Sequence, residues 1–189
     1  MSGFNLDSNI SREKKDSTGG VQSIYVMPFV KYNRREMLFD EQRLILFPST
    51  MLISIHSEVS SFTENPELTP GGTMWDQTLT FEVQKSKASR ELFKMLKQQW
   101  SIVIVDELGN NRILGLRNGL DVTYTNETGN EKGEFNGYRI TATGMEDRQA
   151  LFIADLIATG FTFPVEPDNF VFDDGCNFVF DNGDNYIFD

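Results

Sequence analysis

The sequence predicts a mainly β protein of the α+β class, an antiparallel β-sandwich with one flanking helix. Short β-branched runs recur between turns, as in residues 101–105 and the Asp-, Gly- and Asn-containing residues 106–111 that follow. Residues 74–84 alternate, because Leu79, Phe81 and Val83 are separated by polar side chains. Such alternation is typical of strands that bury one face and expose the other.

The first third of the chain contains several short strand signals. Residues 23–27 form a strand signal that ends at Pro28, which cannot donate a ladder hydrogen bond. A short apolar run occupies residues 44–47, and residues 50–59 indicate a further strand. We expect a strand over residues 60–64 and then a loop over the Pro- and Gly-containing residues 65–72, before the strand at 74–84.

One segment, residues 85–99, has helical periodicity. Its apolar positions recur at spacings of three and four and extend to Trp100, with Leu92, Phe93 and Leu96 on the same stripe. We expect this helix to dock its stripe on the sheet.

The stretch from Trp100 to Thr125 predicts a meander of three consecutive strands around which the rest of the chain is organised. The strands are expected at residues 101–105, 112–116 and 120–125, with a break at Asn118 and Gly119. Residues 138–143 alternate cleanly and predict one more strand. Residues 150–158 are apolar and fit either a short helix or a strand.

The C-terminal end is an internal repeat. The phrase Asn-Phe-Val-Phe-Asp at 169–173 recurs at 177–181 and, with Tyr and Ile substituted, at 185–189. Each unit combines a short strand with an Asp/Asn-Gly turn, which is typical of hairpins. We therefore divide the chain into an N-terminal flexible arm (1–22), a β-sandwich domain (23–163) and an aromatic β-hairpin extension (164–189).

Composition limits the classes of function. The net charge is −11, which disfavours proteins that read DNA or RNA sequence but not a surface past which DNA slides. The single cysteine, Cys176, excludes an internal disulfide. No apolar run approaches the roughly 18 residues of a membrane span, and the polar residues 1–16 do not resemble a secretory signal. We expect a protein made and assembled in a cytoplasm, with no membrane partner.

Catalytic signatures are absent from the sequence. His56 is the single histidine, and no phosphate-binding loop, dinucleotide fingerprint or nucleophile elbow occurs. We expect no catalytic residue, no cofactor and no metal. The Asp- and Asn-rich turns of the C-terminal repeat contain oxygen ligands suited to Ca²⁺, but they lack EF-hand spacing, and a turn role explains them better.

Three predicted strands share one pattern, with apolar residues on one face and Thr-rich polar residues on the other. An ordinary sandwich with solvated outer faces explains this, and so does a sheet that lines a water-filled channel shared among subunits, past which a polyanion would slide. The polar sets are Thr78, Thr80, Glu82 and Gln84, then Asp121, Thr123 and Thr125, and then Arg139, Thr141 and Thr143.

The order of elements resembles the tail-tube family of tailed bacteriophages. Four phrases and the predicted helix carry the resemblance. The phrases are GGVQSIYV at 19–26, SSFTENPELTPGGTMWDQTLTFEV at 60–83, VIVDELGNNRILGLRNGLDVT at 103–123 and FNGYRITATGMED at 135–147. The C-terminal repeat lies outside the resemblance, and it looks like the repetitive Phe, Asn and Asp ends of some phage virion proteins.

The resemblance implies a structural virion protein without enzyme activity. Copies of the chain, six to a ring, would stack into a tube, and their inner sheets would join around a DNA-conducting lumen. Its partners would be itself, other tail proteins, and DNA as non-specific passing cargo, in a virion assembled in the host cytoplasm. The implied lumen face is Thr78, Thr80, Glu82 and Gln84, and the implied inter-subunit loop is Asn65, Pro66, Glu67, Leu68, Thr69, Pro70, Gly71 and Gly72.

Other functions remain as alternatives. The same fold would serve another tail or neck ring, such as a distal-tail, baseplate or terminator protein. The aromatic C-terminal repeat fits a carbohydrate or cell-surface binding module. An enzyme built around His56 ranks last. The sequence does not give the host, the number of copies in a ring, the sheet face that lines a lumen, or the role of the repeat.

Overall fold

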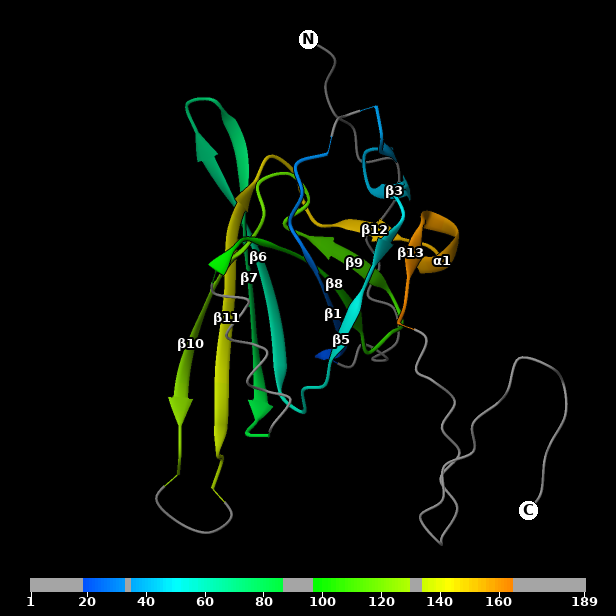
Figure 1. The fold of residues 1–189 in the computed structure, drawn as a ribbon. Helices are drawn as coiled ribbons and strands as arrows, with labels where there is room; N and C mark the ends of the chain where they lie inside the picture. The colour runs from blue at the N-terminus through cyan, green and yellow to red at the C-terminus, as the bar shows by residue number, and fades with distance from the viewer. Residues whose placement is uncertain (1–18, 33–34, 87–96, 130–133, 165–189) are drawn as a thin grey trace, which may run out of the picture.

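The computed structural model describes residues 19–32, 35–86, 97–129 and 134–164, and in this part of the chain the protein is mainly β (Figure 1). Three sheets, of seven, four and two strands, account for the strands, and most strand pairs are antiparallel. The predicted mainly β class is confirmed.

The seven-stranded sheet holds the centre of the molecule. In it β8 lies between β9 and β1, and its five residues from Trp100 to Ile104 are all buried, because both faces of the sheet are covered. In sheet order the strands are β2 (Leu38–Phe39), β3 (Arg43–Leu46), β12 (Leu151–Ile153), β9 (Asn111–Leu114), β8 (Trp100–Asp106), β1 (Val21–Pro28) and β5 (Ile53–Ile55).

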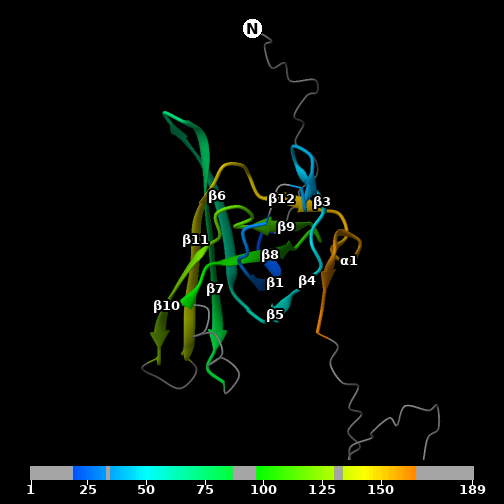
Figure 2. The same ribbon diagram turned by 45° about the horizontal axis from the view of Figure 1, so that its top comes forward.

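The four-stranded sheet is a long antiparallel blade that packs on one face of the seven-stranded sheet. Figures 1 and 2 show it extending past that sheet at both ends, with the turn between β6 and β7 at the upper tip. In sheet order its strands are β10 (Asp121–Glu127), β11 (Gly137–Glu146), β7 (Gly72–Gln84) and β6 (Ser60–Thr69). The strands β10 and β6 are therefore its two edges.

A small third layer covers the other face of the seven-stranded sheet. It consists of the two-stranded parallel sheet β4 (Thr50–Met51) and β13 (Phe161–Thr162), with helix α1 (Leu156–Thr159) beside it. Asp155 caps α1 by accepting a hydrogen bond from Ala158 N at 3.0 Å.

Two hydrophobic cores lie on the two faces of the seven-stranded sheet. The first fills the space between the large sheets, where Leu79 and Phe81 of β7 meet residues such as Ile102 of β8. The second lies under the third layer, where Phe47 and Phe161 stack with ring centroids 5.1 Å apart. Successive residues of β8 point to opposite cores, so this strand belongs to both.

The structure corrects the predicted loop at Asn65 to Gly72. Residues 65–69 continue β6, and β7 begins at Gly72, so that only Pro70 and Gly71 form the turn. Pro66 misled the prediction, because an edge strand tolerates a proline that a central strand does not.

The predicted three-strand meander is also wrong in its third strand. β8 and β9 pair as expected, but the chain then crosses to the other large sheet, where β10 pairs with β11. The single strand predicted at 50–59 is two short strands, β4 and β5, which belong to different sheets. Residues 150–158 contain both a strand, β12, and the helix α1.

Three predicted features lie largely outside the described residues. The helix at 85–99 falls mostly on residues 87–96, and its described ends are not α-helical, while Trp100 belongs to β8 instead of the helix stripe. The C-terminal extension from residue 165 onward, including Cys176, and the arm up to residue 18 also lie outside. β1 starts at Val21, two residues before the predicted start of the domain.

Replacing Phe81 by alanine tests the first core. This side chain is fully buried between the large sheets, so we expect Phe81→Ala to lower the free energy of unfolding by about 3–5 kcal/mol. Denaturant unfolding measures the loss, and Thr80→Ala, on the opposite face of the same strand, is the control. Equal losses in the two variants would contradict this placement of the core.

Candidate functional site: the polar face of the four-stranded sheet

The three Thr-rich sets predicted on separate strands lie on one face of the four-stranded sheet. Cross-strand register places Thr123, Thr141, Thr80 and Ser61 in one row across all four strands. The next row holds Asp121, Thr143, Thr78 and Thr63. We call this surface the polar face; its members are Ser61, Thr63, Asn65, Asp76, Thr78, Thr80, Glu82, Gln84, Asp121, Thr123, Thr125, Glu127, Arg139, Thr141 and Thr143.

The polar face owes its character to strand alternation. The residues between its members, such as Leu79, Ile140 and Ala142, are buried in the first core. Gln84 and the β10 threonines are exposed, whereas Thr78, Thr80 and Glu82 are half-buried because neighbouring strands flank them on both sides. All four residues predicted from β7 therefore lie on one surface.

The one guanidinium of the polar face lies in a third row. There Arg139 of β11 lies opposite Glu82 of β7 and Thr125 of β10. The guanidinium of Arg139 contacts Glu82 at 2.7 Å and Glu127 at 3.0 Å. The hydrogen bond to the Glu82 carboxylate, followed by the negative charge of Glu127, raises the pKa of Arg139 above its ordinary value.

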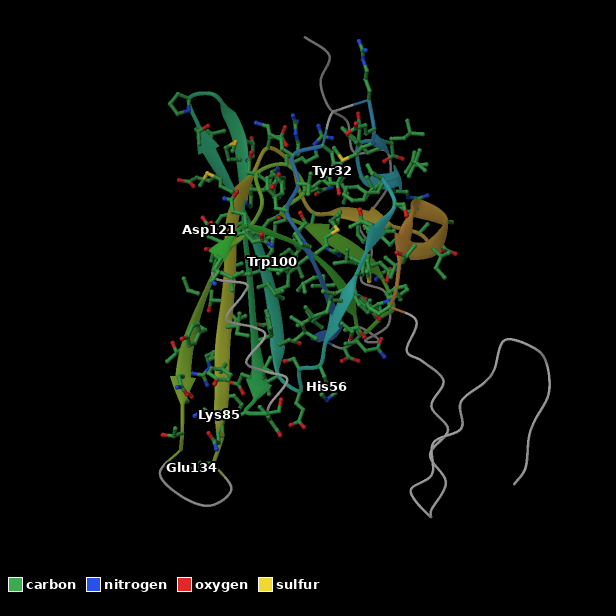
Figure 3. The ribbon with its side chains drawn as sticks, viewed as in Figure 1. Tyr32, His56, Lys85, Trp100, Asp121 and Glu134 are labelled. Carbon is green, nitrogen blue, oxygen red and sulfur yellow. The ribbon has the colours of Figure 1, made fainter. Side chains whose placement is uncertain are left out.

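The start of β10 is fixed by a buried carboxylate. The chain crosses between the two large sheets at residues 115–120, and Glu146 of β11, only 1% exposed, accepts hydrogen bonds from this crossing. Its oxygens accept from Arg117 N at 3.1 Å and from Asn118 N at 2.8 Å. Burial raises the pKa of Glu146, and these backbone hydrogen bonds oppose the rise. Figure 3 shows Asp121, the first residue of β10, close to Trp100 at this crossing.

A second polar contact ties the crossing to the middle of the four-stranded sheet. Gln77 is 2% exposed, and its side-chain oxygen accepts from Gly115 N at 3.0 Å while its side-chain nitrogen donates to Glu64 at 2.9 Å. Gly115 has φ +62°, and a Cβ there would lie 2.7 Å from Leu120 Cγ. The crossing therefore requires glycine at this position.

The predicted inter-subunit loop forms the tip of the β6–β7 hairpin. Leu68 is 87% exposed there, the highest value among the exposed large apolar residues of the described chain. Across the hairpin Leu68 pairs with Thr73, and Thr69 donates its hydroxyl to Gly72 O at 2.7 Å. The segment is therefore a regular, projecting hairpin with an exposed leucine near its tip, and not an irregular loop.

His56 lies in the link between β5 and β6 (Figure 3). It borders a groove of about 250 Å³ together with Glu58 and Glu82. The adjacent hydroxyl of Ser57 donates to Val59 O and accepts from Glu82 N, so it stabilises the turn. The groove contains a histidine and carboxylates. Among the described residues, however, these hydrogen bonds do not orient a nucleophile toward His56.

Sequence reasoning missed two features of the sheet. The pairing of Arg139 with Glu82 and Glu127 depends on strand order, because the residues are far apart in sequence. The role of Glu146 was not predicted, because this residue lies beyond the strand expected at residues 138–143. For Glu146 a signal was present, since it continues the inward-facing parity of Tyr138, Ile140 and Ala142.

Comparison with known proteins yields no relatives. No family model, no curated protein and no solved structure matches the chain. Within the described residues no helix is both long and apolar enough to cross a membrane. The same residues contain no group of three or more His, Cys, Asp or Glu side chains placed to hold a metal ion.

Replacing Glu146 by glutamine tests the buried carboxylate. Because the folded-state pKa is raised above the ordinary 4.5, the titration of Glu146 favours folding most below pH 4.5 and loses that contribution as pH rises through the folded-state pKa. We therefore expect the wild type to lose stability relative to Glu146→Gln between pH 4.5 and neutral pH. Denaturant unfolding of both proteins across this range measures the difference. A pH-independent difference would contradict the raised pKa.

Proposed function

We propose that the protein is a structural ring subunit of a phage tail, in which the polar face lines a lumen that DNA crosses. The observation that carries the proposal is a four-stranded sheet with one dry face, one Thr-rich wet face and two edge strands. The order-of-elements resemblance to tail-tube proteins favours a tube over another tail or neck ring.

The geometry of the sheet is compatible with closure into a ring. Four antiparallel strands alternate in direction, so the edge strands β10 and β6 run in opposite senses. Joining β10 of one copy to β6 of the next would continue the antiparallel alternation without a change of direction. Such a head-to-tail contact closes into a ring when the rotation between copies fits, and closure covers both edges.

The chemistry of the polar face suits a lumen that DNA passes. Its central rows consist of Thr and Ser hydroxyls with Asp121, which remain hydrated and carry no positive charge. The carboxylates Asp76, Glu82, Asp121 and Glu127 outnumber the one guanidinium, Arg139. A hydrated, net acidic wall repels the phosphate backbone and thereby prevents adhesion.

Assembly and its interface are tested together. We expect negative-stain electron microscopy to show rings with a central hole and light scattering to give a discrete multiple, expected to be six, of 21.6 kDa. In a Cys176→Ser background, Thr123→Cys is combined in turn with Ser61→Cys, Thr63→Cys and Asn65→Cys. Within one copy these β10 and β6 positions are about three strand spacings, or about 14 Å, apart, too far for a disulfide.

Cross-links between these positions can therefore form only between copies. We expect covalent multimers under oxidising conditions in at least one combination and in none of the single-cysteine variants. A strict monomer at high concentration would overturn the proposed function. Rings without cross-links in any combination would mean that the copies meet through surfaces other than β10 and β6.

The hairpin tip gives a separate test of stacking. We expect Leu68→Glu to leave rings intact but to prevent their stacking into tubes, because it places a charge on the most exposed apolar side chain of the hairpin. Leu108→Glu is the control, since Leu108 is also exposed but lies in the turn between β8 and β9. Electron microscopy counts rings and tubes. Normal tubes from Leu68→Glu would remove the hairpin from the stacking contact.

A further inference from the structure

Arg139 is an exception on the polar face. It is the single Lys or Arg within the four strands β6, β7, β10 and β11. Its side chain is 47% exposed, so solvent reaches it. A guanidinium is the side chain best suited to bind phosphate, because its planar array of donors matches two phosphate oxygens. On a surface past which DNA slides, an available guanidinium would be an adhesive site.

The donors of Arg139 are directed at carboxylates. Its Nε and Nη2 donate to Glu82 Oε1 at 3.0 Å and 2.7 Å, and its Nη1 lies 3.0 Å from Glu127 Oε1. The two carboxylates come from opposite sides, since β11 lies between β7 and β10. Arg139 thereby links the three strands β7, β11 and β10, so an arginine at this position also has a structural role in the sheet.

The trio of Arg139, Glu82 and Glu127 carries a net negative charge. One guanidinium and two carboxylates sum to −1, so a phosphate that approaches the trio meets net repulsion. To bind, it must also displace at least one carboxylate from a charge-assisted hydrogen bond. The nearby ammonium of Lys85 donates to Glu127 O at 3.3 Å and lies beyond the end of β7.

We propose that Glu82 and Glu127 are positioning residues that hold Arg139 away from phosphate and so keep the polar face from adhering to DNA. This inference rests on the proposed function and gives it a molecular basis. The group that could bind phosphate, the Arg139 guanidinium, is present on the polar face, and the carboxylates of Glu82 and Glu127 mask it.

Charge-matched double variants of the full-length protein test the proposal. Glu82→Gln with Glu127→Gln removes both masking carboxylates, whereas Asp76→Asn with Asp121→Asn removes two carboxylates from the same face and leaves Arg139 paired. The net charge changes equally in the two variants. Binding of a short fluorescent DNA duplex is measured by polarisation between about 50 and about 200 mM salt.

We expect only the Glu82/Glu127 variant to gain affinity. The slope of log affinity against log salt concentration should steepen by about 0.9 for each guanidinium that contacts a phosphate. Adding Arg139→Gln to this variant should return the slope to that of the Asp76/Asp121 control. Equal slopes in the two double variants, or a gain that survives Arg139→Gln, would overturn the proposal. A purely structural role of the trio predicts no change in DNA binding.

Two measurements keep the test interpretable. Light scattering on the same samples reports assembly. Rings whose salt-dependence slope is unchanged would refute the masking of Arg139 but not the proposed function. A steeper slope in a protein that forms no rings would refute the proposed ring. If the double variant does not fold, Glu127→Gln is compared with Asp121→Asn. Both residues lie on the edge strand β10, where a substitution disturbs the sheet least, and the same difference in slope is expected.

Discussion

The contact between the Glu146 carboxylate and the backbone of residues 117–118 determines where the chain passes from one large sheet to the other. Both oxygens of this nearly inaccessible carboxylate accept backbone hydrogen bonds, so three N–H···O contacts hold the crossing against the end of β11. β10 starts directly after the crossing and pairs with the same strand. The edge position of β10, and with it one boundary of the polar face, follows from this contact.

The crossing is crowded, and this crowding sets its sequence requirements. Gly144 of β11 faces the crossing so closely that a Cβ would lie 2.6 Å from Gly119 O. Gln77 reaches the same region from β7 through its bond to Gly115 N. Polar groups in a dry interior must be paired, and here Gln77 bonds to Gly115 N and to Glu64, whose carboxylate also accepts from Ala150 N. The crossing is therefore a rigid junction between the seven-stranded sheet, which is buried on both faces, and the four-stranded sheet, which is buried on one face.

The difference between the two large sheets explains their different chemistry. The seven-stranded sheet is covered on both faces, so its strand β8 is buried without interruption from Trp100 to Ile104. The four-stranded sheet packs through one face, so its other face is available to water and is occupied by Thr, Ser and carboxylate side chains. The one guanidinium of this face, that of Arg139, is paired with the carboxylates of Glu82 and Glu127.

The sequence by itself determined the fold class, the strands at residues 23–27 and 138–143, the turn after Asp106, and the polar side of each alternating strand. These depend on local periodicity and turn chemistry, which neighbouring residues fix. The tertiary structure decided that residues 65–69 extend a strand, that β10 leaves the sheet of β8 and β9, and that three separate Thr-rich sets form one surface. It also decided that Arg139 meets two carboxylates, that of Glu82, which lies 57 residues earlier, and that of Glu127 on the neighbouring strand β10. Strand order and cross-strand register depend on which faces bury one another across the whole chain, and that is settled only when the cores form.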